Sequence, residues 1–154
     1  MDLLIIVVAK YFYVVVVLIA AFYVLTLSKI RKIQLLKLSL LTLPLAYIIS
    51  KILKHFIYDP RPFVVEHVRP LIAHVPDNGF PSDHTLLTMT IASIIFVYNR
   101  TLGFVLGGLA IAIGISRVAA RVHHPLDIIG SVVIAIGATA ISQFALSYFK
   151  KRSI

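Results

Sequence analysis

The sequence contains no cysteine, and acidic residues are scarce, with six Asp and Glu residues in 154. The lack of cysteine excludes disulfides, thiolate catalysis and cysteine metal sites. Charged residues make up only 14% of the chain, whereas 60% of the residues are hydrophobic. Because a soluble domain is typically about 25% charged, this composition excludes a water-soluble protein.

Long hydrophobic runs take the place of the missing charges. The uncharged runs 11–27 and 128–149 approach or exceed the length of about 20 residues that crosses a bilayer. The first run does not resemble a removable signal peptide, because Asp2 precedes it instead of a basic region. We therefore expect an all-α, polytopic membrane helix bundle in a single domain, 1–154. About five transmembrane helices are predicted, at 3–28, 33–53, 83–98, 101–117 and 126–149.

Basic residues in the connections predict the orientation, because short loops rich in Lys and Arg stay on the cytoplasmic side. One set follows the first, third and fifth expected spans: Lys29, Arg31, Lys32, Lys37, Arg100, Lys150, Lys151 and Arg152. Most acidic residues and all six histidines lie toward the opposite side. We therefore expect a cytoplasmic C-terminus and an extracytoplasmic loop between spans two and three. The net charge of +9 indicates contacts with membrane lipids and no nucleic-acid partner, since no basic stripe follows a soluble surface.

Three polar clusters lie at the extracytoplasmic ends of the expected spans. They are Lys54 with Arg61-Pro62, then Pro81-Ser82-Asp83-His84, and then Ser116-Arg117 with His123 and Asp127. Lys54, Arg61 and Arg117 can surround a phosphoryl group with cationic donors. The helix capped by Ser82 or Asp83 would point its free backbone N–H groups at the same anion. These residue types are typical of a phosphate site.

The third cluster also contains a pair that suits nucleophilic catalysis. Pro125 at a first helical position places His123 just before the helix and Asp127 in its first turn. The carboxylate can then bond one imidazole nitrogen and leave the other free as a nucleophile, with His84 as an acid or base. Two interfacial histidines bonded to backbone carbonyls are the simpler alternative. This alternative does not explain why three cations and a carboxylate accompany the two histidines.

The spacing of these residues resembles the three-part signature of the type 2 phosphatidic acid phosphatase superfamily. The matching positions are Lys54 followed by six residues and Arg61-Pro62, Pro81-Ser82-x-His84, and Ser116-Arg117 followed by five residues, His123, three residues and Asp127. Within the superfamily, segments 58–64 and 79–85 are similar to the bacitracin-resistance-type undecaprenyl-diphosphate phosphatases. The resemblance covers nearly the whole chain.

The resemblance implies a single membrane phosphatase domain that works without metal or cofactor on a lipid phosphate or diphosphate. His123 would attack phosphorus to form a phosphohistidine, and His84 would protonate the leaving oxygen. Lys54, Arg61, Ser82 and Arg117 would bind the phosphate. Asp83 joins this phosphate-binding set. The wider family usually has glycine at this position, and the resemblance implies that an aspartate here is a feature of the diphosphate branch.

Three alternatives remain open at this stage. A phosphatidylglycerophosphate or lipid A phosphatase would share the site but cleave a monophosphate. A lipid-phosphate carrier would share the cations but needs no nucleophile. A zinc site built from His123, His124, His67 and His74 is disfavoured because no ligand spacing closes it, so no metal is expected. The sequence does not indicate an oligomeric state.

Overall fold

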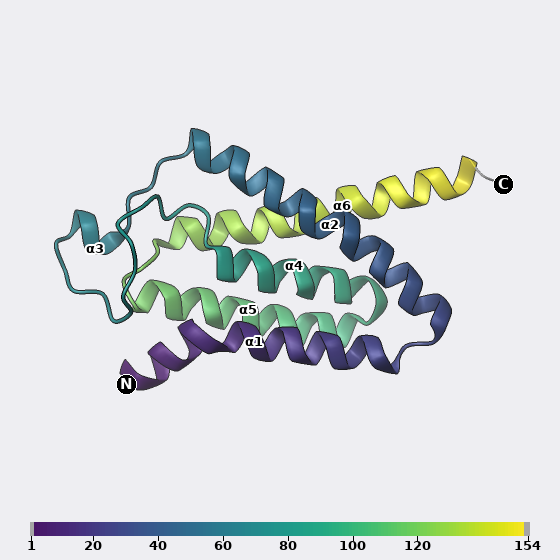
Figure 1. Cartoon of the computed structure of the whole chain (residues 1–154), viewed down its shortest axis with the longest axis horizontal. Helices are drawn as coiled ribbons and strands as arrows, with labels where there is room; N and C mark the ends of the chain where they lie inside the picture. Colours follow the sequence, from purple (N-terminus) through teal and green to yellow (C-terminus); the bar gives the residue numbers. More distant parts are fainter. Residues whose placement is uncertain (1, 153–154) are drawn as a thin grey trace.

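The computed structural model describes residues 2–152, apart from the side chain of Lys150, one of the predicted inner cations. Within this range the chain forms six helices and no strand, which confirms the all-α fold class. The helices are α1 (Asp2–Thr26), α2 (Lys29–Phe56), α3 (Pro62–Val65), α4 (Asp83–Tyr98), α5 (Arg100–Ala119) and α6 (Pro125–Arg152). Five of them run along the bundle in alternating directions, and the N- and C-terminal ends lie at opposite ends of the molecule (Figure 1).

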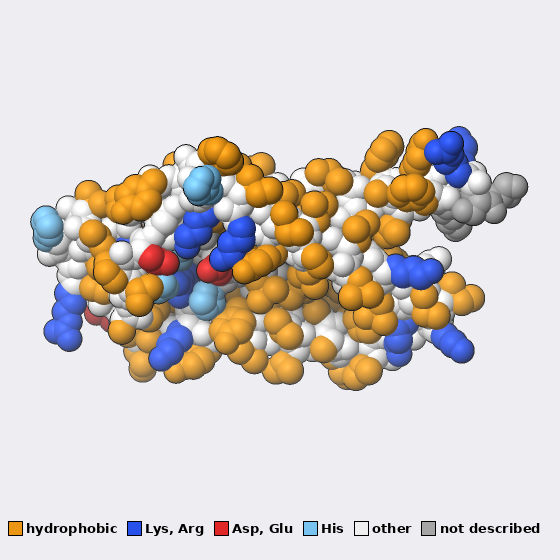
Figure 2. Space-filling model, turned by 45° about the horizontal axis from the view of Figure 1, so that its top comes forward, with side chains coloured by type: hydrophobic (Ala, Val, Ile, Leu, Met, Phe, Trp, Pro, Cys, Tyr) orange, Lys and Arg blue, Asp and Glu red, His pale blue; other side chains and the backbone are white. Residues whose placement is uncertain are grey.

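The long helices suit a bilayer. Among the described residues, four helices are long and apolar enough to cross a membrane: α1, α2, α5 and Pro125–Phe149 of α6. The 16-residue α4 is apolar but shorter. Figure 2 shows hydrophobic side chains along the bundle. Toward one end, acidic side chains and histidines lie beside Lys and Arg, whereas toward the other end the face in view has Lys and Arg alone.

Helices α2, α5 and α6 extend beyond the ranges expected from apolar runs at both ends, whereas α4 matches its expected range and α1 ends at Thr26 instead of residue 28. The clearest case is α2, which spans Lys29–Phe56 where we predicted 33–53. Its added first turn contains basic residues, and these can extend their charged ends to the membrane interface while the backbone stays helical. Apolar runs therefore mark the membrane-buried part of a helix and underestimate its full length.

Helix α4 lies at the centre of the bundle and contacts α1, α2, α5 and α6. Its buried hydroxyls are satisfied locally: Thr88 Oγ1 donates to the His84 carbonyl at 2.8 Å, and Thr90 Oγ1 donates to the Leu86 carbonyl at 2.7 Å. Gly103 lets α5 approach closely, because a Cβ there would overlap the Phe96 backbone of α4. These contacts leave α4 surrounded and fix the site residues at its N-terminal end.

The segment between α2 and α4 closes one end of the bundle, and Asn78 holds it in place. Its Nδ2 donates to the carbonyls of Lys54 at 3.0 Å and Ile57 at 2.7 Å, at the C-terminal end of α2. Its Oδ1 accepts from the backbone N–H groups of Asp59 and Phe80, each at 3.0 Å. One side chain thus ties the end of α2 to both sides of the loop, close to Arg61.

Candidate active site

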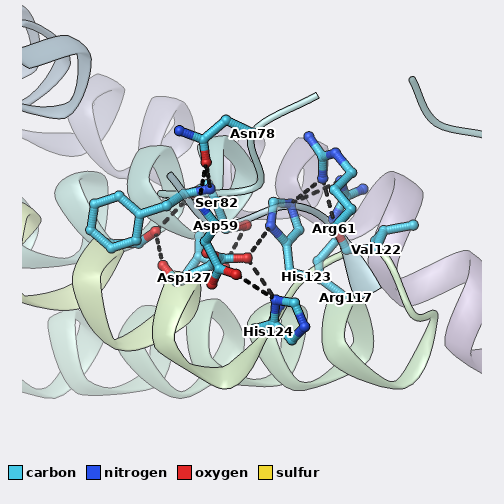
Figure 3. Close-up of polar contacts among 12 residues, drawn as sticks. Asp59, Arg61, Asn78, Ser82, Arg117, Val122, His123, His124 and Asp127 are labelled. Atoms are coloured by element: carbon cyan, nitrogen blue, oxygen red, sulfur yellow. Dashed lines mark hydrogen bonds and ion pairs between the residues drawn. The ribbon is translucent and has the colours of Figure 1, made fainter. Parts of the chain in front are cut away.

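The start of α6 brings His123 and Asp127 together as predicted. Pro125 begins the helix, and His123 Nδ1 lies 3.0 Å from Asp127 Oδ2 (Figure 3). The side chain of Asp127 is fully buried and that of His123 is 3% exposed. Because a carboxylate can only accept, Nδ1 carries the proton and Nε2 of His123 is unprotonated.

That unprotonated nitrogen accepts from two arginines that come from distant parts of the chain. His123 Nε2 lies 3.3 Å from Arg61 Nη1 and 3.4 Å from Arg117 Nη2. Both arginines are buried, Arg61 directly before α3 and Arg117 in the last turn of α5. Arg61 Nη1 also donates to the Val122 carbonyl at 2.7 Å, whereas Arg117 Nε is buried without a partner among the described residues. A nucleophilic nitrogen and the cationic donors of two arginines, of which Arg117 Nε is unused, therefore meet at one place, as a phosphate site requires.

The surroundings keep His123 neutral. Burial lowers the pKa of His123 below its usual value, the hydrogen bond to Asp127 opposes this, and the positive charges of Arg117 and Arg61 lower the pKa further. A lowered pKa means that the imidazole becomes protonated only at a more acidic pH than usual. The unprotonated Nε2 needed for attack on phosphorus is therefore the prevailing form at neutral pH.

Asp77 occupies part of the cationic site, which the sequence did not predict. Its Oδ1 accepts from Arg61 Nε at 2.7 Å, and its Oδ2 lies 3.5 Å from Lys54 Nζ. Burial acts to raise the pKa of Asp77, but the Arg61 hydrogen bond and the charges of Arg61 and Lys54 outweigh it and lower that pKa. Asp77 is thus an ionised partner that holds two predicted phosphate ligands together.

The predicted residues of α4 have different surroundings. Ser82 is the N-cap and is fully buried, and its backbone N–H donates to the Asp127 carbonyl at 3.4 Å. His84 is half-buried, and its ring packs edge-on against the Tyr13 ring with 5.0 Å between centroids. Arg117 and His123 are close enough for their charges to act on His84. Asp83 is exposed and forms no ion pair within residues 2–152. The carboxylate of Asp83 can therefore remain hydrated.

Two further residues adjoin His123 or its partner without having been predicted. The His74 ring lies 6.4 Å from the His123 ring between centroids, and burial together with Arg61 and Arg117 lowers the pKa of His74. Asp59 Oδ1 lies 3.0 Å from His124 Nδ1, while burial and the charge of Asp127 raise the pKa of Asp59 against the opposing effect of His124. Asp59 stands two residues before Arg61, so only its place in segment 58–64 marked it in the sequence.

Comparison with known proteins connects this geometry to one family. A model of the PAP2 superfamily matches residues 35–152. The chain is 40% identical over 79 residues to undecaprenyl-diphosphatase BcrC of Bacillus subtilis, which covers 51% of this chain and 41% of that protein. It is 38% identical over 92 residues to bacitracin transport permease protein BcrC of Bacillus licheniformis, covering 59% of this chain and 45% of that one. The chain thus spans less than half the length of these curated relatives.

A solved structure has a similar fold over most of the molecule. LpxE of Aquifex aeolicus matches with a TM-score of 0.68 and 25% sequence identity, and the match covers 91% of this chain and 92% of LpxE. The similarity therefore extends beyond the motif-bearing helices to the arrangement of the whole bundle.

The position of Asp77 predicts that it competes with a bound phosphate. Asp77→Asn removes the negative charge near Arg61 and Lys54, and a unit charge about 4 Å away is worth about 1 kcal/mol in a water-like medium. We therefore expect the affinity of the solubilised protein for inorganic phosphate, measured by calorimetric titration, to rise by about fivefold. Glu66→Gln, at an exposed carboxylate of the same segment, is the control and should leave this affinity unchanged. Equal or weaker phosphate binding by Asp77→Asn would mean that Asp77 orients Arg61 and does not compete.

Proposed function

Because the chain belongs to the PAP2 superfamily, we propose that it is a membrane lipid phosphatase that hydrolyses a polyprenyl diphosphate, such as undecaprenyl diphosphate, to the monophosphate and inorganic phosphate. The observation that carries this proposal is the arrangement around His123. Its Nδ1 faces Asp127, while its Nε2 lies beside Arg61 and Arg117. A carrier that only binds lipid phosphates needs the cations but has no use for a nucleophile oriented by a carboxylate.

The proposed reaction has two stages. His123 Nε2 forms a bond to phosphorus while the bond from phosphorus to the leaving lipid monophosphate breaks, and His84 protonates the leaving oxygen. Water then attacks the phosphohistidine with the help of His84, which releases inorganic phosphate and restores free His123. Two guanidinium groups and one ammonium supply the positive charge that stabilises the transferring group, so the route needs no metal or cofactor.

Lys54, Arg61, Ser82 and Arg117 are the proposed phosphate ligands. Arg61 and Arg117 lie beside His123 Nε2, and Lys54 joins them through Asp77. The buried Ser82 begins α4 next to them. The Bacillus subtilis relative named undecaprenyl-diphosphatase supports a diphosphate substrate, and a lipid monophosphate is a weak base and hence a good leaving group.

We also propose that residues 1–154 act as one membrane phosphatase domain with its site on the extracytoplasmic side. At the opposite end of the bundle are the cations Lys29, Arg31, Lys32, Lys37, Arg100, Lys151 and Arg152. Cations in short connections mark the cytoplasmic side. Their separation from the catalytic histidines supports this orientation.

The orientation is testable because the chain has no cysteine of its own. Val75→Cys, at an exposed position of the site loop, should react with a membrane-impermeant maleimide in intact cells. Ile30→Cys, exposed near the start of α2, should react only after permeabilisation. The reverse pattern would overturn the proposed side of the active site.

The nucleophile and its orienting carboxylate should give different kinetic losses. His123→Ala should abolish both phosphate release by the solubilised protein and the labelled phosphoenzyme trapped by an alkaline denaturing quench, because a phosphohistidine survives base and hydrolyses in acid. Asp127→Asn should leave the KM nearly unchanged but lower kcat by up to about 10,000-fold, because an amide misorients the imidazole. His55→Ala, at an exposed histidine of α2, is the matched control. Near-native turnover by His123→Ala would exclude the proposed mechanism.

The leaving group should determine how much His84 matters. Removing a general acid typically costs about 100- to 10,000-fold, and the loss shrinks as the leaving group improves. We expect His84→Ala to retain more activity on a lipid diphosphate than on a lipid monophosphate, while His123→Ala loses both.

Asp83→Gly should raise the monophosphate turnover relative to the diphosphate turnover. The measurement is a set of steady-state rates of wild type and each variant on both substrates. An equal loss on both substrates for His84→Ala, with no change of preference for Asp83→Gly, would remove the physical argument for a diphosphate substrate and leave it resting on the family resemblance alone.

A further inference from the structure

A second group of ligand-type side chains lies behind the catalytic pair. Asp59 follows α2, His124 precedes α6, and Asp127 lies in the first turn of α6. One donor atom from each lies within 4.8 Å of the others, and His124 Nδ1 is 3.0 Å from Asp59 Oδ1 (Figure 3). The group is distinct from the cations, which lie beside Nε2 of His123.

Two polar atoms of this group are buried without a hydrogen-bond partner in the described part of the chain. Asp127 is fully buried, and its Oδ2 accepts from His123 Nδ1 and from the His124 backbone N–H at 2.9 Å, but its Oδ1 accepts nothing. His124 Nδ1 also has no hydrogen-bond partner, although it lies 3.0 Å from Asp59 Oδ1. A buried polar atom left without a partner destabilises the folded protein. Two such atoms beside two carboxylates form a place that a proton on Asp59 or a metal ion can fill.

We propose that Asp59, His124 and Asp127 bind a divalent transition-metal ion, and Zn²⁺ in particular. Zinc accepts imidazole nitrogen and carboxylate oxygen at about 2.0–2.2 Å, and three protein ligands leave a fourth position for water. Mg²⁺ and Ca²⁺ prefer all-oxygen sites, so the imidazole favours zinc over both. The donor atoms come from two parts of the chain, the segment after α2 and the start of α6.

The zinc site shares Asp127 with the catalytic histidine. A cation on Oδ1 draws negative charge away from Oδ2, which weakens the support that Asp127 gives to His123. Zinc should therefore slow the hydrolysis. This consequence depends on the proposed function, whereas zinc binding itself does not.

Zinc binding is tested first on the purified, solubilised full chain without any lipid substrate. In competition with a chromophoric zinc chelator, wild type should bind one zinc ion per chain, and zinc should raise its thermal unfolding midpoint. Asp59→Asn and His124→Gln should each weaken the binding by at least about tenfold. His55→Gln and His67→Gln, at exposed histidines, are matched controls and should leave it unchanged.

The unfolding midpoints without zinc distinguish a lost ligand from a lost fold, and either variant that keeps the wild-type midpoint suffices for the test. Absence of stoichiometric zinc binding by wild type would overturn the proposal. Zinc binding that a folded variant fails to weaken would overturn it as well.

The regulatory consequence needs a separate assay. Zinc should slow phosphate release by wild type, a chelator should restore it, and Asp59→Asn should resist zinc at the same concentration. Zinc binding without loss of turnover would overturn the inhibitory role. A protein that binds zinc but releases no phosphate would overturn the proposed function and leave the zinc site standing.

Discussion

The buried carboxylate of Asp127 is the feature on which the rest of the site depends. The backbone carbonyl of Asp127 accepts from Ser131 Oγ at 2.7 Å, and the same hydroxyl lies 3.0 Å from the Ser82 carbonyl at the start of α4. The loop passes directly over the carboxylate at Gly79, where a Cβ would come within 3.0 Å of Asp127 Oδ2 and 3.2 Å of the Asp59 carbonyl. A buried carboxylate is costly unless its surroundings satisfy it. Asp127 therefore couples α6, α4 and the loop to the orientation of His123.

Around this carboxylate, opposite charges are separated on the two sides of one imidazole ring. Arg61 and Arg117 lie beside Nε2, and Asp127 lies beside Nδ1. Asp77 offsets part of the positive charge of Arg61 and Lys54 and holds both near the site. Fixed charges of this kind, in a place largely closed to water, stabilise a transferring phosphoryl group without having to reorganise.

The sequence predicts those parts of the site that depend on local spacing. The contact between His123 and Asp127 follows from one turn of helix after Pro125, and the element order follows from apolar runs of membrane length. The convergence of Arg61 and Arg117 on His123 depends on tertiary structure, so the sequence pointed to it only through the shared side of the polar clusters and through the family resemblance.

The loop between α2 and α4 has no periodic pattern, and its contacts could not be predicted. Asp77 meets Arg61 because Asn78 ties the loop to the end of α2, and Asp59 meets His124 because Gly79 allows a close approach. The histidine set considered for zinc was incomplete for the same reason. His124 has carboxylates beside it, whereas His67 is exposed. Contacts between residues far apart in sequence leave no trace in local spacing.

The balance between charge and proton transfer bears on the substrate. Two arginines are buried and aimed at one nitrogen, whereas the one proposed acid, His84, is only half-buried and packs against Tyr13. A phosphate ester of an alcohol needs a strong acid at the leaving oxygen, because an alkoxide is a poor leaving group. Cleavage of a lipid diphosphate releases a lipid monophosphate, which is a stable leaving group. This reaction needs stabilisation of negative charge above all. A site that fixes cations so firmly therefore supports the lipid diphosphate that we propose as the substrate.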